Sequence, residues 1–479
     1  MLRSVTALLI VLASGMPYAM AQDSAGEKIK AGRAALLAEN PQAALELYRA
    51  ALAILPSEAR QDRFVTLMGI GRSAAWLEQY QLAERSYREA LTLASSDEDR
   101  VIAAAGLSEM LNVLERPRAA FGLSRPLAST SLAHAVQAAR AALILDWPDK
   151  AREALETQAS SVTPEIEETR VGRTFRTQQE ELAFRTGWVL SSAAEYAKDS
   201  DNVRTYDVLV RAGMSPPSAQ AAFGITRWDI TARHQTIDDG SRRTEVPQLE
   251  GGMKINASDD IKLLISAGAA EARGWTYPVG TARVSYRPSD DWGAEISTDH
   301  DAVRTVTALA NRTDYSTATI GGDVRLVNTT FAAAVFRQWF SDENERDGWV
   351  GRITPPSFLP FGPGGPATAL QLYARRFDSS RRDVVGYFNP ERYHEERLNL
   401  IVSTRFSPTW TLRMVAGVGQ ESIEGTRSST LNVDARVSGR LSPATRIDFS
   451  LRHGDSAAFS SSGVGYSQTA AGVTLGFLL

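Results

Sequence analysis

Apolar and polar residues alternate with a period of two through the last third of the chain. In the segments 431–441, 446–452 and 471–479, alternate positions are mostly apolar, and the positions between them, Leu478 excepted, are polar, charged or small. Successive side chains of a β-strand point to opposite faces, so each segment predicts a strand with two unlike faces. A soluble β-sandwich has the same period, but a dense row of Arg and Asp better fits a water-filled interior behind a lipid-facing apolar belt. The pattern therefore predicts a membrane β-barrel.

The same period recurs upstream and sets the expected size of this barrel. Candidate strands separated by turn residues such as Asp238-Asp239-Gly240 number about fourteen to sixteen between Phe223 and Leu479. Tryptophans near the ends of these strands suit the aromatic girdles of a membrane barrel, with burial in a soluble core as the alternative. They are Trp228, Trp275, Trp292, Trp339, Trp349 and Trp410.

The first half of the chain follows the helical period instead. It is rich in Ala, Leu, Glu and Arg, and the change at Met214-Ser215-Pro216-Pro217 predicts a helical domain over 22–214 and a barrel over 218–479. Two segments match the small-residue and aromatic offsets of a tetratricopeptide repeat. They contain Gly32, Ala44, Tyr48, Ala51 and Pro56, and then Gly71, Ala83, Tyr87 and Ala90. Weaker copies at 106–120 and 135–155 and degenerate helices at 175–197 and 203–212 complete the expected solenoid, with an ordinary helical bundle as the alternative.

The N-terminus has the features of a secretory signal. A basic start at Arg3, a short apolar stretch and the small residues Ala19-Met20-Ala21 predict a signal peptide over 1–21. The alternative is a membrane-anchoring helix. The chain has no cysteine, which excludes disulfides and thiolate metal sites. Its formal net charge of −4 argues against nucleic-acid binding.

The polar positions of the predicted strands give the candidate lumen of the barrel. The charged residues on this face lean basic, which favours an anionic polymer by screened attraction, although Arg and Asp that pair across strands and stiffen the barrel are equally expected. The candidates are Arg227, Asp229, Arg233, Arg283, Arg287, Arg413, Asp434, Arg436, Arg446, Asp448 and Arg452. The segment Thr354–Pro366 has five prolines and three glycines and predicts an extracellular loop, either a lid, an inward-folded constriction or an ordinary exposed loop.

Signals for catalysis are weak. The five histidines lie far apart, with no pair at metal-ligand spacing, and no Gly-x-Ser-x-Gly elbow is present. A remote alternative is an outer-membrane acyl hydrolase that uses Ser456 with His453. We therefore expect a protein that is not an enzyme and has no cofactor, no metal site and no catalytic residue.

One segment resembles a known family. Gly386, Tyr387, Phe388, Asn389 and Pro390, followed by Tyr393, resemble the glycine-aromatic-aromatic-Ser/Asn-proline motif of the cellulose-synthase outer-membrane subunit, whose architecture poly-N-acetylglucosamine export porins share. The segments Arg304–Ala310 and Trp339–Asn344 look like shortened versions of the same barrel. The solenoid is much shorter than the cellulose subunit usually carries, and the chain ends in Leu479 where many barrels end in Phe.

The resemblance implies a tetratricopeptide-like solenoid in the periplasm followed by a transmembrane antiparallel barrel in the bacterial outer membrane. The implied function is export of an exopolysaccharide, cellulose-like or another biofilm polymer. The expected partners are the polysaccharide in transit, outer-membrane lipids, and periplasmic and inner-membrane synthase components bound by the repeats, with no nucleic acid. A surface receptor or adsorption protein with a plugged barrel is the alternative. The sequence names neither the polymer nor the oligomeric state.

Overall fold

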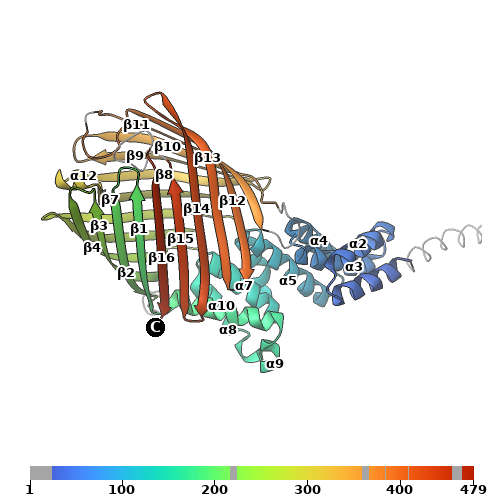
Figure 1. Cartoon of the computed structure of the whole chain (residues 1–479). Helices are drawn as coiled ribbons and strands as arrows, with labels where there is room; N and C mark the ends of the chain where they lie inside the picture. Colours follow the sequence, from blue (N-terminus) through green and yellow to red (C-terminus); the bar gives the residue numbers. More distant parts are fainter. Residues whose placement is uncertain (1–23, 216–223, 359–365, 383, 408, 456–465) are drawn as a thin grey trace, which may run out of the picture. The chain divides into compact units, whose positions relative to one another are not determined.

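The computed structural model describes residues 24–215, 224–358, 366–382, 384–407, 409–455 and 466–479. The expected signal peptide and Pro216-Pro217 lie outside these residues. The chain divides into two compact units, Met1–Gln179 and Glu180–Leu479, and each is described by itself. Figure 1 shows that the first unit is helical and that the second is a closed barrel.

Helices make up the first unit. After a helix at 24–37 come α2 (Pro41–Ile54), α3 (Arg60–Trp76), α4 (Tyr80–Leu93), α5 (Asp97–Val113), α6 (Pro117–Ser124), η1 (Arg125–Leu127), α7 (Leu132–Ile144), α8 (Pro148–Glu156), η2 (Ala159–Ser161), α9 (Pro164–Glu167) and α10 (Arg170–Thr186). The end of α10 belongs to the second unit. Among the residues that the structure describes, no helix is long and apolar enough to cross a membrane.

One turn geometry recurs four times in the helical unit. Glu39, Glu78, Glu115 and Asp146 have positive φ between consecutive helices. After each, the next backbone N–H bonds back to a carbonyl five residues earlier, as from Asn40 to Ala35 and from Gln79 to Ala74. This is the Schellman end of a helix, and its repetition divides the unit into four successive helix pairs. The pairs coincide with the four copies expected from the sequence, while their assignment as tetratricopeptide repeats stays a prediction.

Tyrosine rings fill the space between neighbouring pairs. A Cβ on Gly32 would lie 3.1 Å from the Tyr48 ring, and one on Gly69 only 2.4 Å from it. Tyr87 takes the same place between Gly71 and Gly106, each of whose added Cβ atoms would lie 2.7 Å from the ring. Glycine is needed here because any side chain would overlap the aromatic ring, so the sequence offsets report a real close approach.

The second unit is a closed antiparallel barrel of 16 strands. They are β1 (Val189–Asp199), β2 (Arg204–Met214), β3 (Ile225–Asp238), β4 (Arg243–Asn256), β5 (Ile261–Ala272), β6 (Trp275–Tyr286), β7 (Trp292–Ala302), β8 (Asp314–Leu326), β9 (Thr329–Phe340), β10 (Glu345–Thr354), β11 (Ala367–Ser379), β12 (Arg392–Ser407), β13 (Trp410–Ile423), β14 (Thr426–Ser442), β15 (Thr445–Gly454) and β16 (Gln468–Leu478). A short helix, α12 (Val306–Ala310), lies between β7 and β8. Pairing of β1 with β16 closes the ring.

The structure corrects the expected boundary between the domains. The segments 175–197 and 203–212 were expected to be helical up to residue 214, but β1 begins at Val189 and β2 ends at Met214. β1 contains Ala, Glu and Lys, which favour helices in isolation. Pairing with β16 on one side and β2 on the other outweighs that preference, because without β1 and β2 the barrel would have two open edges.

The connections divide between the two ends of the barrel. We call the end where β1 begins and β16 ends the base, and the opposite end the rim. β10 ends and β11 begins at the base, since ten crossings return the chain to its starting side, so both ends of the Pro- and Gly-rich segment Thr354–Pro366 lie there. The sequence predicted an extracellular loop here, and because the chain enters the barrel at the base, that prediction and a periplasmic helical unit exclude each other. Residues 359–365 of this segment lie outside the described part.

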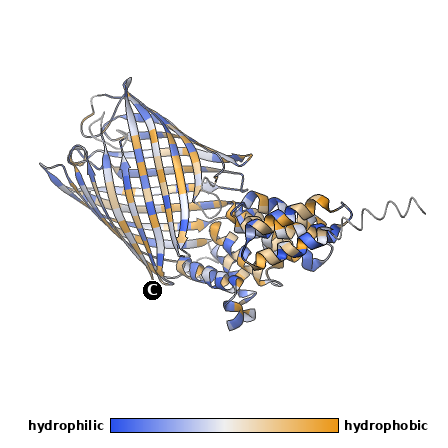
Figure 2. Ribbon diagram, turned by 45° about the vertical axis from the view of Figure 1, so that its right-hand side comes forward, coloured by the Kyte–Doolittle hydropathy of each residue, from blue (hydrophilic) through white to orange (hydrophobic). Residues whose placement is uncertain are grey.

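A belt of the outer face of the barrel is apolar, while charged residues such as Arg337 and Asp347 lie on this face near the rim. The register places Leu190, Ile296, Val335, Leu400 and Phe449 on this face, and all five side chains are exposed. Figure 2 shows the resulting alternation of apolar and polar residues along the strands. Five of the six singled-out tryptophans point outward, as a girdle requires. Trp275 does not: it packs against a buried cluster beside Tyr277 on the inner wall.

Candidate functional site

The strand register places the candidate lumen residues on one face. Paired strands keep directly opposite residues on the same side of a sheet, so the inner face can be followed from β1 through the ring and back. All eleven candidates fall on this inner face: Arg227, Asp229, Arg233, Arg283, Arg287, Arg413, Asp434, Arg436, Arg446, Asp448 and Arg452. A contact between any of them and a substrate stays a prediction.

Several of these residues form ion pairs across the inner wall. The Arg233 guanidinium donates to the Asp207 carboxylate at 2.9 Å, and the Arg283 guanidinium lies 3.4 Å from the Glu295 carboxylate. Arg287 pairs with Asp323, and Arg452 with Glu195. Two of these pairs join adjacent strands and two reach across one intervening strand, so the structural role weighed from the sequence applies to these positions.

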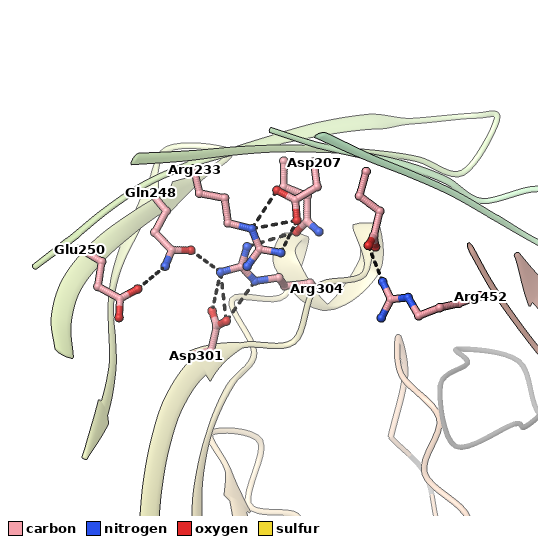
Figure 3. A network of polar contacts seen from close by, with 9 residues as sticks. Asp207, Arg233, Gln248, Glu250, Asp301, Arg304 and Arg452 are labelled. Carbon is pink, nitrogen blue, oxygen red and sulfur yellow. Dashed lines mark hydrogen bonds and ion pairs between the residues drawn. The ribbon is translucent and has the colours of Figure 1, made fainter. Parts of the chain in front are cut away.

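A cluster of polar contacts links the inner wall to the connection between β7 and β8. The Arg304 guanidinium donates to Asp301 at 3.0 Å, to Gln235 at 3.1 Å and to Gln248 at 2.5 Å (Figure 3). Gln248 in turn donates to Glu250 at 3.0 Å. Arg304, two residues before α12, thus ties β3, β4 and β7 to the segment that leads into that helix.

The helix α12 packs against the inner wall near the rim. Its Val306 and Leu309 are buried in a cluster with Ile237, Val246 and Tyr277, which lie on the inner faces of β3, β4 and β6. The Thr305 hydroxyl caps the helix by accepting from the Ala308 N–H at 3.1 Å. The helix thereby covers an apolar patch of the inner wall and occupies space within the rim.

The motif segment Gly386–Pro390 packs against another part of the inner wall. Phe388 lies in a buried cluster with Phe377, Tyr393 and Ile423, the inward residues of β11, β12 and β13. The Phe377 and Tyr393 rings stack at 4.7 Å between centroids, and Phe388 meets both edge-on. The aromatic residues of the motif therefore serve to hold the connection between β11 and β12 inside the barrel.

A polar hub fixes the other side of the same segment. The Tyr387 ring stacks on Phe340 at 4.8 Å, and its hydroxyl donates to the Asp342 carboxylate at 3.0 Å. Asn344 donates to the Tyr387 hydroxyl at 3.1 Å and to the Asn389 side chain at 2.8 Å. Burial raises the pKa of Tyr387, so the phenol stays protonated and keeps its role as a donor.

The two inward segments touch each other. The Thr305 hydroxyl donates to the Gly386 carbonyl. Gly386 has φ +108°, and a Cβ there would lie 2.9 Å from the Ala308 backbone nitrogen. Three segments that resemble one family in the sequence, Arg304–Ala310, Trp339–Asn344 and Gly386–Pro390, are therefore brought together at the rim. We call this assembly the rim latch.

The base of the barrel carries an element that the sequence did not reveal. Glu180 and Glu181 of α10 pair with Arg440 and Arg446 on the inner face of β14 and β15, at 2.8 and 2.6 Å. The Phe184 ring lies 3.7 Å from the Arg446 guanidinium. Burial opposes the ionisation of Glu181, but Arg185 and Arg446 outweigh it and lower its pKa. Two adjacent glutamates on a helix do not reveal in the sequence that distant arginines will pair with them, so only the fold could identify this contact.

The structure adds no geometry for catalysis or metal binding. Within the described residues, no group of three His, Cys, Asp or Glu side chains could hold a metal ion. Ser456 lies outside the described part. His453 lies on the outward side of β15, where its ring contacts Thr469 at 2.9 Å and Asp455 at 3.0 Å.

Comparison with known proteins identifies the fold. No protein-family model and no curated protein matches the sequence. Among solved structures, the barrel resembles a "Bacterial polysaccharide outer membrane secretin" at 14% identity and TM-score 0.51, over 62% of this chain and 99% of that one. Pseudomonas putida OprB, in its high-pH structure, matches at 8% identity and TM-score 0.36, over 63% and 96%. Pseudomonas aeruginosa OccK7 matches at 11% and 0.34, over 61% and 98%. The first of these likenesses supports the fold of an outer-membrane barrel and, at 14% identity, nothing more specific.

Proposed function

We propose that this protein is an outer-membrane channel that exports an exopolysaccharide, with its helical unit in the periplasm. The observation that carries the proposal is the inner face of the barrel, where arginines and carboxylates line much of the wall and two apolar clusters hold the rim latch. A sliding polymer needs hydrogen-bonding side chains without one tight site, and this face provides them. The fold likeness to a polysaccharide secretin agrees with this role but does not establish it.

Passage of a polymer requires the rim latch to move. α12 and the segment Gly386–Pro390 occupy space inside the rim and are joined by the Thr305–Gly386 hydrogen bond. We expect the channel to conduct little at rest and to open when the latch leaves the wall. Sixteen strands leave room for a water-filled lumen once these segments are displaced.

The helical unit has the form of a binding scaffold. Its four helix pairs, joined by one recurring turn, are expected to be tetratricopeptide-like repeats that present an extended surface to a periplasmic partner. The partner would be a component of the synthase or an enzyme that modifies the polymer. This surface also explains why a transport protein would carry helices at all.

Two measurements test the function. Deletion of the gene should abolish secreted polysaccharide, and re-expression should restore it. Purified protein in a planar bilayer should show rare openings that become frequent when residues 384–389 are shortened to a glycine linker. Two results together would identify a plugged receptor instead. The purified barrel would stay closed in both forms, and deletion of the gene would leave polysaccharide secretion unchanged. The rim segments that fold into the barrel are the observation that favours this second function.

A truncation tests the scaffold. Because β1 begins at Val189, a deletion must end before α10 to leave the barrel whole, so we choose 25–168. The truncated barrel should insert and conduct ions but export little polymer. Export at the wild-type rate with the other components present would mean that the helices are only a spacer. Protease added to intact cells should leave the helical unit uncut if it is periplasmic.

A further inference from the structure

The inner wall of the barrel is electrostatically two-sided. On β2 to β8, inward arginines face carboxylates: Arg211 lies 3.7 Å from Asp229, Arg283 lies 3.4 Å from Glu295, and Arg233 and Arg287 pair with Asp207 and Asp323. On β9 to β16, the inward carboxylates among the described residues are Glu395, Glu421, Asp434 and Asp448. Inward arginines outnumber these four carboxylates on β9 to β16, and some of those arginines have no carboxylate partner among the described residues.

Four of these arginines are exposed on the inner face without a carboxylate, and one of them, Arg405, lies near the end of β12 at the base. The other three, Arg352, Arg413 and Arg436, have exposed side chains, and no carboxylate of the described residues comes within 4.0 Å of any of their guanidinium groups. Asp434, two residues from Arg436, lies opposite Arg452 in the register. Arg413 and Arg436 are therefore cationic and hydrated in the lumen, where an anion could reach them.

Arg413 and Arg436 are direct partners across β13 and β14. Like charges placed directly opposite each other destabilise a sheet, so this pair costs stability unless an anion lies between the two groups. A guanidinium presents a planar fork of donors that fits carboxylate and phosphate. Two facing forks on an inner wall form a site for one acidic group of a passing chain.

A second position lies further toward the rim. The Tyr373 ring lies between two arginines from the neighbouring strands, with the Arg397 guanidinium 4.4 Å and the Arg352 guanidinium 5.8 Å from its centroid. Arg397 is six residues from Ser403, the residue opposite Arg413. At about 3.3 Å per residue, the two positions are roughly 20 Å apart along the strand. An aromatic face beside cations suits a sugar ring that carries an acidic group.

We propose that Arg352, Arg413 and Arg436 form an anion-binding stripe in the lumen and that the exported polysaccharide is acidic, with carboxylate or phosphate groups along its chain. The proposal rests on the export function proposed above and names its substrate class. Successive acidic groups would move from one cationic position to the next. The water-filled lumen weakens each contact, which keeps the chain mobile.

Binding of defined oligosaccharides tests the stripe. The probes are oligomers of galacturonate, of glucose and of glucosamine, equal in length, titrated calorimetrically into the full chain in neutral detergent. The galacturonate oligomer should bind most tightly, and its binding should weaken as salt is added. The double variant Arg413→Ser/Arg436→Ser should weaken its binding by roughly tenfold, since two charge contacts are lost.

Two matched variants separate charge from structure. Arg413→Lys/Arg436→Lys keeps both charges and should retain most of the affinity for galacturonate. Arg283→Ser/Glu295→Ser removes an ion pair from the opposite wall without changing the net charge and should leave that affinity unchanged. Equal or tighter binding of a neutral or cationic oligomer, no binding of any oligomer, or wild-type affinity in the double serine variant would overturn the proposal.

The composition of the exported polymer separates this inference from the function beneath it. If deletion of the gene abolishes secretion and the lost polymer contains acidic sugars or acidic substituents, both stand. If secretion is lost but the polymer is neutral or cationic, the export function holds and the anion-binding stripe is wrong. If secretion is unchanged, the export function fails, and the substrate class that rests on it fails with it.

Discussion

Replacing Gly386 with alanine tests whether the rim latch holds the channel shut. Gly386 has φ +108°, and its missing Cβ would lie 2.9 Å from the Ala308 nitrogen. A non-glycine residue held in such a conformation costs about 1–3 kcal/mol. The latched state alone pays this cost, because a released segment can relax its backbone. The ratio of open to latched channels should therefore rise by roughly 5-fold to 150-fold.

Single-channel recording in a planar bilayer measures this ratio directly, as the fraction of time that the channel conducts. Gly425 supplies the matched control, since it also has positive φ (+85°) but lies in the turn between β13 and β14 with no atom within 4 Å of its would-be Cβ. Gly425→Ala should strain a turn without affecting the latch, so its open fraction should match the wild type. An unchanged open fraction in Gly386→Ala, or an equal rise in both variants, would refute the latch.

Three further predictions concern the lipid face and the helical unit. Leu400→Arg places a charge on the outer face at mid-strand and should lower the stability of the folded barrel by roughly 2–4 kcal/mol. The inward change Arg436→Ser should lower it far less. Equal losses of heat-modifiable folded barrel on gels in both variants would contradict the face assignment. Gly69→Ala should destabilise the helices by about 1–3 kcal/mol, because its Cβ would lie 2.4 Å from a tyrosine ring. Gly122→Ala is the control: its Cβ would have nothing within 4 Å, so the change should be neutral or slightly stabilising. Thermal unfolding followed by circular dichroism measures both. Burial lowers the pKa of His134 despite its hydrogen bond to the Val101 carbonyl, so the fold favours the neutral ring. The helices should therefore lose stability as pH falls below about 6.5. The same pH dependence in a His134→Gln variant would exclude His134 as the cause.

The sequence determined the features that depend on local periodicity. Alternation with a period of two identified the inner and outer faces correctly at Arg436 and Leu400, because strand geometry fixes the direction of every second side chain. The offsets of Gly32, Tyr48 and Gly71 located the helix pairs, since only a missing side chain lets an aromatic ring lie against the backbone. These signals need no knowledge of distant partners.

Only the tertiary structure decided what depends on partners far away in the chain. β1 is a strand because β16 pairs with it, although its alanines and charged residues favour a helix. The end of the barrel at which β10 stops and β11 starts follows from counting strands, which requires that β1 and β2 be known. The sequence named Gly386–Pro390 as a motif, but its contact with Thr305 comes from two connections that fold into one lumen. Likewise, a basic lean was visible in the sequence, and the register alone showed that Arg413 and Arg436 face each other while Arg233 and Arg283 are neutralised. Charge type is a property of the residue, whereas pairing is a property of the closed barrel.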